Sequence, residues 1–500
     1  MSSAAHPVQP SFEWHASAHD RSQFQVVFDY SVRQEGAPEV WGLRPRFRVD
    51  LFLVAPRALE VGSSASPKEA FFEQMTQRTC LNVPDLERFS HGDLLDLEHY
   101  LALGLDLGAR RALVPRVVQE VKLFAFWINE GLREALKNEQ LKYKRDLKSW
   151  VELVDGFRQR HVEAVKAQGG AVDDEVLEAV LDADAFLSAI LEQSLGWAAV
   201  AGRRKAKQQM ALRLRRPVAS DRRALERHAL RHRLLKKRIS QILYLESHEI
   251  HRHQIYRNLA AAMGAGLAAL FAETARYYNT VATGTADFSL RVAVFIGLAV
   301  VAYVFKDRLK DLSKDYFGRK VVGSLADRES RLQLPYVGPV GEPRAVDVAR
   351  HQESVQGLGF DALPDDIRYV WERMGGEIAR GADTIHYAKE LWIEPEALQT
   401  LEFGDLSVKE VIRFDTTPFL AYLDEPLTEL AQYDEVDGVV IRKAPKVYPL
   451  DVVLRVSLGP EGAPDRSVQL DGFRVVLDKS GIVRVEQPLQ RGRYRWRIAS

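Results

Sequence analysis

The chain has very little cysteine: Cys80 is the single thiol among 500 residues. One thiol excludes an intramolecular disulfide and any zinc cluster built from cysteines. Residues 1–20 are polar and lack an apolar core of signal-peptide length, so we expect no export signal. The 32 glycines and 21 prolines are too few for a collagen-like or low-complexity chain.

Common catalytic and nucleotide-binding motifs are also absent. The sequence contains no G-x-x-x-x-G-K-[ST] phosphate loop, no G-x-G-x-x-G after a strand, no G-x-S-x-G elbow and no H-E-x-x-H zinc motif. The catalytic residues therefore stay unassigned, no cofactor is expected, and a function without catalysis is favoured over an enzymatic one.

The charge of the chain is balanced overall but segregated along the sequence. Its 69 basic and 69 acidic residues give a net charge of zero. Residues 203–238 hold 15 lysines and arginines against two acids, Asp221 and Glu226, which leaves 54 basic and 67 acidic residues elsewhere. A mass of 56.6 kDa exceeds what one hydrophobic core usually supports, so several domains are expected.

Alternating apolar residues predict strands at both ends of the chain. Residues 23–32 and 46–54 alternate near the N-terminus, and residues 447–458, 468–477 and 482–486 do so near the C-terminus. This period of two is typical of strands with one buried face. The sequence Asp478-Lys479-Ser480-Gly481 predicts a hairpin turn, with Phe473, Val475 and Leu477 on one face of the strand before it.

The middle of the first half is predicted to be helical, and so is the start of the C-terminal part, roughly residues 364–410. An apolar stripe runs along residues 121–165, a second helix follows from 172 to about 197, and the pair is expected to reverse at Gly169-Gly170 and pack antiparallel. Asp174, Glu178 and Asp182 form a row on the second helix. We interpret this row as a solvated face or an electrostatic mate for the basic segment, with an ion site as the weaker alternative.

Two uncharged apolar segments, 258–272 and 292–305, raise the question of a membrane. Each is shorter than the roughly 20 residues that a spanning helix needs, which favours a buried helical hairpin. Basic residues on both flanks and small residues inside the segments favour a transmembrane hairpin instead. We expect the hairpin to span the inner membrane as a two-pass anchor, with both termini cytoplasmic and residues 273–291 on the far side.

The basic segment has three interpretations. It could contact anionic lipid headgroups, bind nucleic acid, or be a solvated face without a ligand. No aromatic residue lies within 203–238, which disfavours binding to single strands. The candidate residues for binding lipid or nucleic acid are Arg203, Arg204, Lys205, Lys207, Arg213, Arg215, Arg216, Arg222, Arg223, Lys236, Lys237 and Arg238.

Two further groups of residues carry weaker hypotheses. His248 and His251 are three residues apart and could share a helix face, and with Glu249 or His253 they could ligate a metal, although a polar helix without a metal explains them better. Cys80 is interpreted as a packed, inert thiol, because a catalytic cysteine needs a histidine beside it.

The fold class that follows is an α+β, membrane-anchored, multidomain protein. The predicted parts are a β-containing region (1–65), a helical region with a long antiparallel pair (66–200), a basic juxtamembrane segment (201–257), a transmembrane hairpin (258–305), a juxtamembrane helix with a Pro/Gly linker (306–345) and a cytoplasmic α+β domain (346–500). The favoured function is a membrane-anchored scaffold, sensor or effector that binds lipid and a protein partner. The alternatives are a tethered enzyme with its active site in the C-terminal region, and a nucleic-acid-binding protein that uses residues 203–238.

Overall fold

The computed structural model describes most of the chain residue by residue. The described ranges are 11–32, 45–56, 67–82, 87–103, 106–137, 147–200, 221–250, 326–338, 343–375, 383–394, 406–460, 467–488 and 496–499, with isolated residues at 59, 397, 401 and within 258–308. The chain divides into two compact units. The larger comprises residues 1–247, 332–350 and 355–500, and the smaller comprises 248–331 and 351–354.

Two β-sheets dominate the fold. The smaller has the order β1-β2-β9-β4, with β1 (Ser11–Ala18), β2 (Gln23–Val32), β4 (Met75–Leu81) and β9 (Leu406–Asp415). The larger has the order β15-β14-β13-β12-β3-β8-β7-β6-β5. Its strands are β3 (Pro45–Ala55), β5 (Glu246–Glu249), β6 (Arg328–Val337), β7 (Pro343–Gly359), β8 (Asp383–Ile393), β12 (Tyr448–Pro460), β13 (Ser467–Asp478), β14 (Gly481–Pro488) and β15 (Trp496–Ala499).

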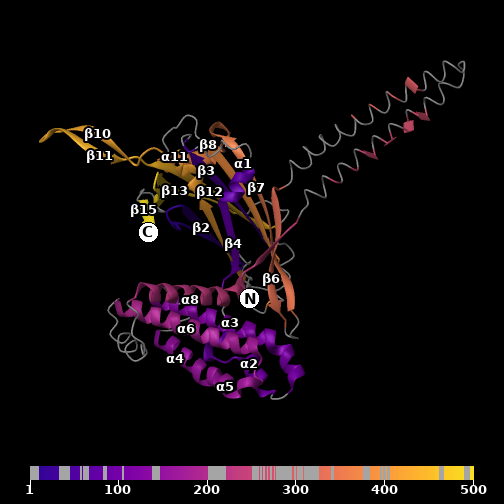
Figure 1. Ribbon diagram of the computed structural model, residues 1–500. Helices are drawn as coiled ribbons and strands as arrows, with labels where there is room; N and C mark the ends of the chain where they lie inside the picture. Colours follow the sequence, from indigo (N-terminus) through magenta and orange to yellow (C-terminus); the bar gives the residue numbers. More distant parts are fainter. Residues whose placement is uncertain are drawn as a thin grey trace, which may run out of the picture. The chain divides into compact units, whose positions relative to one another are not determined.

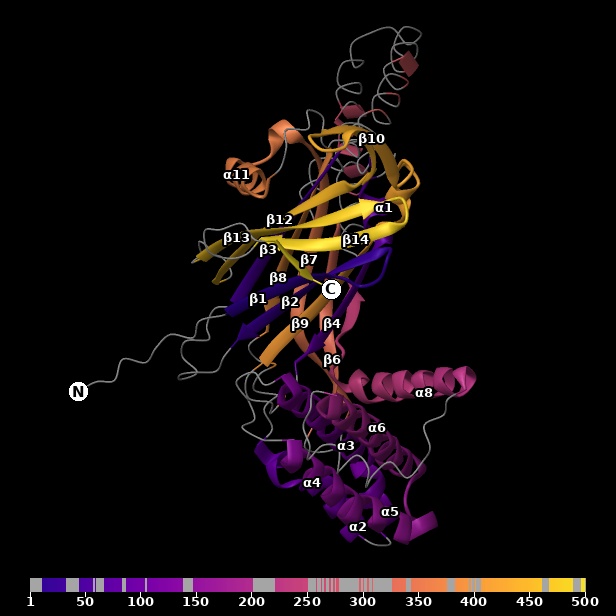
Figure 2. The same cartoon turned by 90° about the vertical axis from the view of Figure 1, so that its left-hand side faces the viewer.

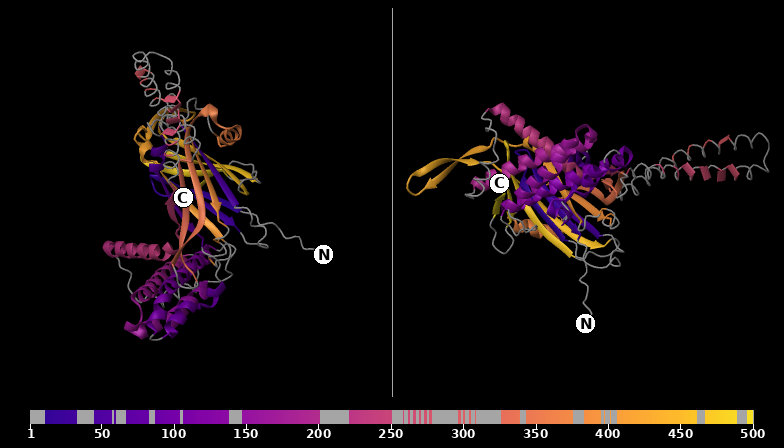
Figure 3. Two further views of the ribbon diagram at one scale, coloured as in Figure 1. Left: turned by 90° about the vertical axis from the view of Figure 1, so that its right-hand side faces the viewer. Right: turned by 90° about the horizontal axis from the view of Figure 1, so that it is seen from below.

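Strands from the two ends of the chain lie side by side in both sheets. β2 pairs antiparallel with β9, and β3 lies between β12 and β8. Figure 3 shows the same arrangement, with indigo strands beside orange and yellow ones. The N-terminal strands therefore complete their sheets only with strands that follow more than 300 residues later.

The alternation seen in the sequence sets which face of each strand is buried. The hairpin of β13 and β14 is confirmed: Asp478 pairs with Gly481, and Phe473, Val475 and Leu477 are all fully buried. On β3, Phe47, Val49, Leu51 and Leu53 belong to the main core. The even-numbered side chains of β3 point to the opposite face because successive residues of a strand alternate.

The core of the larger unit lies between the two sheets and continues into the helices. Aromatic rings join the sheets: Phe473 of β13 lies 5.8 Å from Trp14 and 5.9 Å from Phe24, and Phe47 lies 5.2 Å from Tyr30. The same cluster of buried residues includes Val121, Phe124, Leu187 and Ile239 from the helices. One continuous core therefore supports both the strands and the helices.

The helices between residues 95 and 240 gather in one group, apart from the strands (Figure 2). They are α2 (Leu95–Ala102), α3 (Leu107–Lys137), α4 (Leu147–Phe157), α5 (Glu163–Gln168), α6 (Asp174–Val200) and α8 (Arg222–Ser240). The reversal expected at Gly169-Gly170 is confirmed by a short turn in which Gly169 has φ of +52°. The stripe over 121–165 is divided between α3 and α4–α5 rather than forming one helix, and α6 packs chiefly on α3.

The region 364–410, predicted to be helical, is mostly β. Helix α11 (Asp365–Arg373) is followed by β8 and β9, while α1 (Pro67–Gln74) and α13 (Thr417–Leu420) are the other short helices outside the main group. The prediction was wrong because β8 is central in its sheet and buried on both faces, so its apolar residues do not alternate. Its Ala388-Lys389-Glu390-Leu391 stretch also consists of strong helix formers.

Two strands form a separate ribbon. β10 (Leu427–Asp434) and β11 (Gly438–Pro445) pair with each other and make up a two-stranded sheet of their own. Figure 1 shows that this ribbon projects outward from the main group of strands. Its exposed large apolar side chains include Leu427, Tyr433, Val439 and Ile441.

The predicted membrane anchor needs correction. Within the residues that the structure describes, no helix is both long enough and apolar enough to cross a membrane. The segments 258–272 and 292–305 fall short of the roughly 20 apolar residues required, and most of 258–305 lies outside the described residues. The transmembrane hairpin, the membrane-anchored fold class and the two-pass inner-membrane location are therefore not supported.

Candidate functional site

The basic part of the sequence that the structure describes is helix α8. It begins after Asp221, whose carboxylate accepts a hydrogen bond from the Arg223 backbone N–H at 3.3 Å and so caps the helix. Its 19 residues carry eight lysines and arginines against one acid, Glu226. The helix therefore has a net charge of +7, with its two histidines neutral.

One side of α8 packs against α6. Leu235 and Ile239 are buried, and the His232 ring stacks on Phe186 with centroids 6.3 Å apart. Burial, together with Lys236 and His228, lowers the pKa of His232, which keeps this contact neutral at pH 7. Apolar packing thus holds the helix at its C-terminal half.

A charged contact borders this packing. Nη1 of Arg238 donates to Oε1 of Glu178 at 2.7 Å and to Oδ2 of Asp182 at 2.8 Å. The hydrogen bond and charge of Asp182, followed by the charge of Glu178, raise the pKa of Arg238. Glu178 and Asp182 of the acidic row on α6 therefore form ion pairs with Arg238, the last arginine of the basic segment. This agrees with the interpretation of the row as an electrostatic partner of that segment.

The same residue pattern occurs a second time on α8, and the two leucines of this second copy lie away from the side that packs against α6. Leu235-Lys236-Lys237-Arg238-Ile239 has apolar residues at its first and fifth positions and arginine at the fourth, and Leu230-Arg231-His232-Arg233-Leu234 matches it. A step of five residues turns a helix by about 140°. This places Leu230 and Leu234 on a different face, where they are 49% and 54% exposed.

Basic side chains surround these two leucines. Arg227 lies three residues before Leu230 and Lys237 three residues after Leu234, so both share the exposed face. In the described part of the chain, no carboxylate lies within ion-pair distance of Arg227 or Lys237, whereas Arg222 pairs with Glu226 at 3.2 Å. We call Arg227, Leu230, Leu234 and Lys237 the basic face of α8.

The structure places only some of the candidate residues predicted from sequence. Arg222, Arg223, Lys236, Lys237 and Arg238 lie on α8. The others, Arg203, Arg204, Lys205, Lys207, Arg213, Arg215 and Arg216, lie outside the described residues.

The histidine candidates do not form the helix face that their spacing indicated. His248 lies in strand β5 and is exposed, and His251 and His253 lie outside the described residues. Among the residues that are described, no three histidine, cysteine, aspartate or glutamate side chains cluster closely enough to hold a metal ion.

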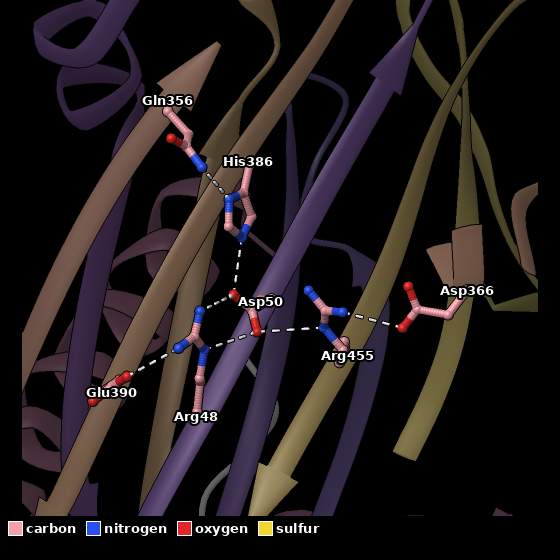
Figure 4. A network of polar contacts seen from close by, with 7 residues as sticks. All are labelled: Arg48, Asp50, Gln356, Asp366, His386, Glu390 and Arg455. Atoms are coloured by element: carbon pink, nitrogen blue, oxygen red, sulfur yellow. Dashed lines mark hydrogen bonds and ion pairs between the residues drawn. The ribbon is translucent and has the colours of Figure 1, made fainter. Parts of the chain in front are cut away.

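A second polar site lies on the larger sheet, on the face opposite the main core. Figure 4 shows side chains from β3, β7, β8, β12 and α11 pointing toward Asp50. Arg48 donates to both Asp50 oxygens at 3.1 and 3.2 Å, and Nη1 of Arg48 reaches Glu390 at 3.3 Å. Arg455 lies 3.6 Å from Asp50 and 3.1 Å from Asp366.

His386 completes this network. Because an ionised carboxylate only accepts hydrogen bonds, Nε2 of His386 donates to Oδ1 of Asp50 at 2.9 Å, and Nδ1 then accepts from the Gln356 amide at 2.9 Å. The imidazole stacks on Phe52 with centroids 4.3 Å apart. The tautomer and orientation of His386 are therefore fixed from three sides.

The electrostatics of the network follow from this pairing. Burial acts to raise the pKa of Asp50, but the hydrogen bonds from His386 and Arg48 and the charge of Arg48 outweigh it, so the pKa lies below the ordinary 3.8. Three hydrogen bonds and the nearby Arg455 cation satisfy most of the acceptor capacity of the Asp50 carboxylate. The network pairs a histidine with an aspartate, as catalytic sites do, yet its contacts include no serine, cysteine or threonine that could act as nucleophile.

A buried ion pair joins the two sheets. Lys389 of β8 donates to Glu410 of β9, and both side chains are only 1% exposed. Gln77 donates to the same carboxylate oxygen, and the Tyr30 hydroxyl donates to the other at 2.9 Å. Sequence reasoning identified neither this pair nor the Asp50 network; polar residues inside apolar strands, such as Asp50 and Lys389, were the available signal.

Cys80 behaves as a packed thiol. Burial raises its pKa to about 11, with Asp29 and Glu130 adding to the shift and Lys409 opposing it. The thiol therefore stays protonated near neutral pH and is a poor nucleophile.

Comparisons with known proteins give no relative from which a role could be inferred. No family model matches the chain, and neither a curated protein nor a solved structure shows significant similarity to it. Function must therefore be argued from the residues themselves.

Proposed function

We propose that this protein acts by binding rather than by catalysis, as a scaffold or effector whose basic face on α8 recognises an acidic segment of a protein partner. The observation that carries the proposal is the repeated pattern on α8. One copy of the pattern, with Arg238, already binds the carboxylates of Glu178 and Asp182 on α6. In the other copy, Leu230, Arg233 and Leu234 are exposed to solvent.

The chemistry of the basic face favours a protein over other anionic partners. Arginine, which supplies six of the eight cations of α8, forms forked hydrogen bonds with carboxylates. Leu230 and Leu234 add an apolar centre, which suits a partner with carboxylates around an apolar residue. Nucleic acid would gain nothing from these leucines, and α8 offers no aromatic ring for stacking on bases.

A binding assay with an acidic amphipathic peptide tests the proposal. The probe carries the sequence of residues 174–191, which includes the carboxylate row that Arg238 binds, and its fluorescence anisotropy is measured against the full chain. We expect saturable binding that weakens as salt rises from 50 to 500 mM, since salt screens exposed charges (screening length about 10 Å at 0.1 M).

Charge reversal on the helix identifies the surface. Arg227→Glu with Lys237→Glu should weaken peptide binding about tenfold, equivalent to about 1.4 kcal/mol. The matched control is Arg222→Glu with Lys236→Glu, which makes the same charge change away from the two leucines and should cost less than threefold. Equal losses in both variants, or tighter binding to anionic lipid vesicles or to an oligonucleotide in the same assay, would contradict the proposal.

A further inference from the structure

The ribbon of β10 and β11 carries a second exposed surface, and that surface is apolar. Cross-strand pairs place Tyr433 beside Val439 and Ala431 beside Ile441 on one face. Tyr433, Val439 and Ile441 are 79%, 72% and 67% exposed. An isolated two-stranded ribbon is at best marginally stable in water, so an apolar face of this kind needs a covering surface.

The charge of the ribbon indicates what would cover it. Residues 427–445 hold four acids, Glu429, Asp434, Glu435 and Asp437, against Arg442 and Lys443, which gives a net charge of −2. Two ribbons would repel each other. The basic face of α8 has the opposite sign and its own exposed leucines, so it complements the ribbon in both charge and polarity.

The dimensions of the two surfaces also agree. Each ribbon strand has eight residues, about 27 Å at 3.4 Å per residue. Helix α8 has 19 residues, about 28 Å at 1.5 Å per residue. A ribbon lying along α8 would therefore cover the helix over its whole length.

We infer that the ribbon of one chain docks on the basic face of α8 in a second copy of the same chain. This inference rests on the proposed function, because it names the second copy's ribbon as the acidic partner of that face. The zero net charge of the chain fits such an assembly, because like copies then do not repel each other strongly. Since each chain carries both surfaces, the contact is head-to-tail and builds rings or open chains of molecules.

Complementary variants of the full chain test this geometry by sedimentation velocity at 50 mM salt. The helix variant is Arg227→Glu with Lys237→Glu, and the ribbon variant is Tyr433→Ser with Ile441→Ser. The wild type should form species larger than a dimer as concentration rises to about 100 μM, and should dissociate at 500 mM salt. Each variant alone should be monomeric. An equimolar mixture should form a one-to-one dimer and nothing larger, because only one intact helix face and one intact ribbon remain per pair.

Circular dichroism and thermal melting establish that both variants are folded. A helix variant that still dimerises while the ribbon variant does not would show ribbon-to-ribbon pairing and overturn the inference. A mixture that stays monomeric, or a wild type that is monomeric at every concentration, would also overturn it.

The acidic peptide separates this inference from the proposed function. If the ribbon variant still binds the peptide while the wild type does not assemble, the second-copy inference fails and the proposed function stands. If the peptide binds neither the wild type nor the ribbon variant, the proposed function fails as well as the second-copy inference.

Discussion

The charges of the sheets and the charges of α8 differ in how far the protein itself pairs them. Lys389, Glu410 and Asp50 are buried, and each has an oppositely charged or hydrogen-bonded partner. On α8, Arg238 is paired within the fold, while Arg227 and Lys237 face solvent without a carboxylate among the described residues. The difference indicates that the sheet charges serve folding and that the exposed charges of α8 remain available for binding.

The largest expected effect on stability concerns the ion pair between the sheets. Glu410→Gln breaks the buried ion pair with Lys389, and breaking a buried pair by removing one partner typically costs about 3–5 kcal/mol. Urea unfolding should show this loss, whereas peptide binding by the folded variant should not change. The double variant Lys389→Met with Glu410→Leu should recover part of the loss, because apolar side chains can replace a buried pair, while Gln77 and Tyr30 lose the acceptor that Glu410 provides. If Glu410→Gln were as stable as the wild type, the sheet charges would not support folding, and the distinction between them and the charges of α8 would be lost.

The Asp50 network should give a smaller effect that depends on pH. Asp50→Asn removes the charge that Arg48 and His386 hold, and we expect a loss of about 1.5–3 kcal/mol at pH 7. Because the folded pKa of Asp50 lies below 3.8, its contribution is present above the unfolded pKa and disappears as pH falls through the folded pKa. The stabilities of wild type and variant should therefore converge as the pH falls below the usual aspartate pKa of about 3.9. A difference that stays constant from pH 7 to pH 2 would contradict the assignment.

The smallest effects should come from α8 itself. Arg238→Ala removes a solvent-exposed ion pair, and such pairs contribute little to stability, so the melting temperature should fall only slightly. Arg227→Ala removes a side chain without an ion-pair partner in the described part of the chain, so it should leave the melting temperature unchanged. Differential scanning calorimetry of both variants measures these changes. A loss above 2 kcal/mol for Arg227→Ala would show that this arginine supports the fold rather than a partner.

Some of the fold could be predicted because local alternation is enough to reveal a strand with one buried face. β2 and the hairpin of β13 and β14 are of this kind, with apolar residues at every second position. β8 escaped detection because it is a central strand buried on both faces, so apolar and helix-forming residues occur on both of its faces instead of alternating. The membrane hairpin was predicted from composition and flanking charge, and no described helix supports it.

The candidate site could be predicted only in part. Segregated charge identified the basic segment, but which face of α8 is occupied depends on Leu235 and Ile239 packing against α6, and sequence cannot show that contact. The Asp50 network depends on register: β3 lies between β8 and β12, so Arg48, His386 and Arg455 meet although more than 300 residues separate the first from the others. No local pattern could have brought them together.

Hydrogen–deuterium exchange of the full chain with the acidic peptide tests the central claim most directly. We expect slower exchange of the amides in residues 222–234, where α8 is least packed, and no change in the strands around His386. This protection should disappear in 500 mM salt and in the variant Arg227→Glu with Lys237→Glu, and it should persist in Arg222→Glu with Lys236→Glu. Protection that instead appears around Asp50 and His386, with α8 unchanged, would contradict the account and place the ligand on the sheet.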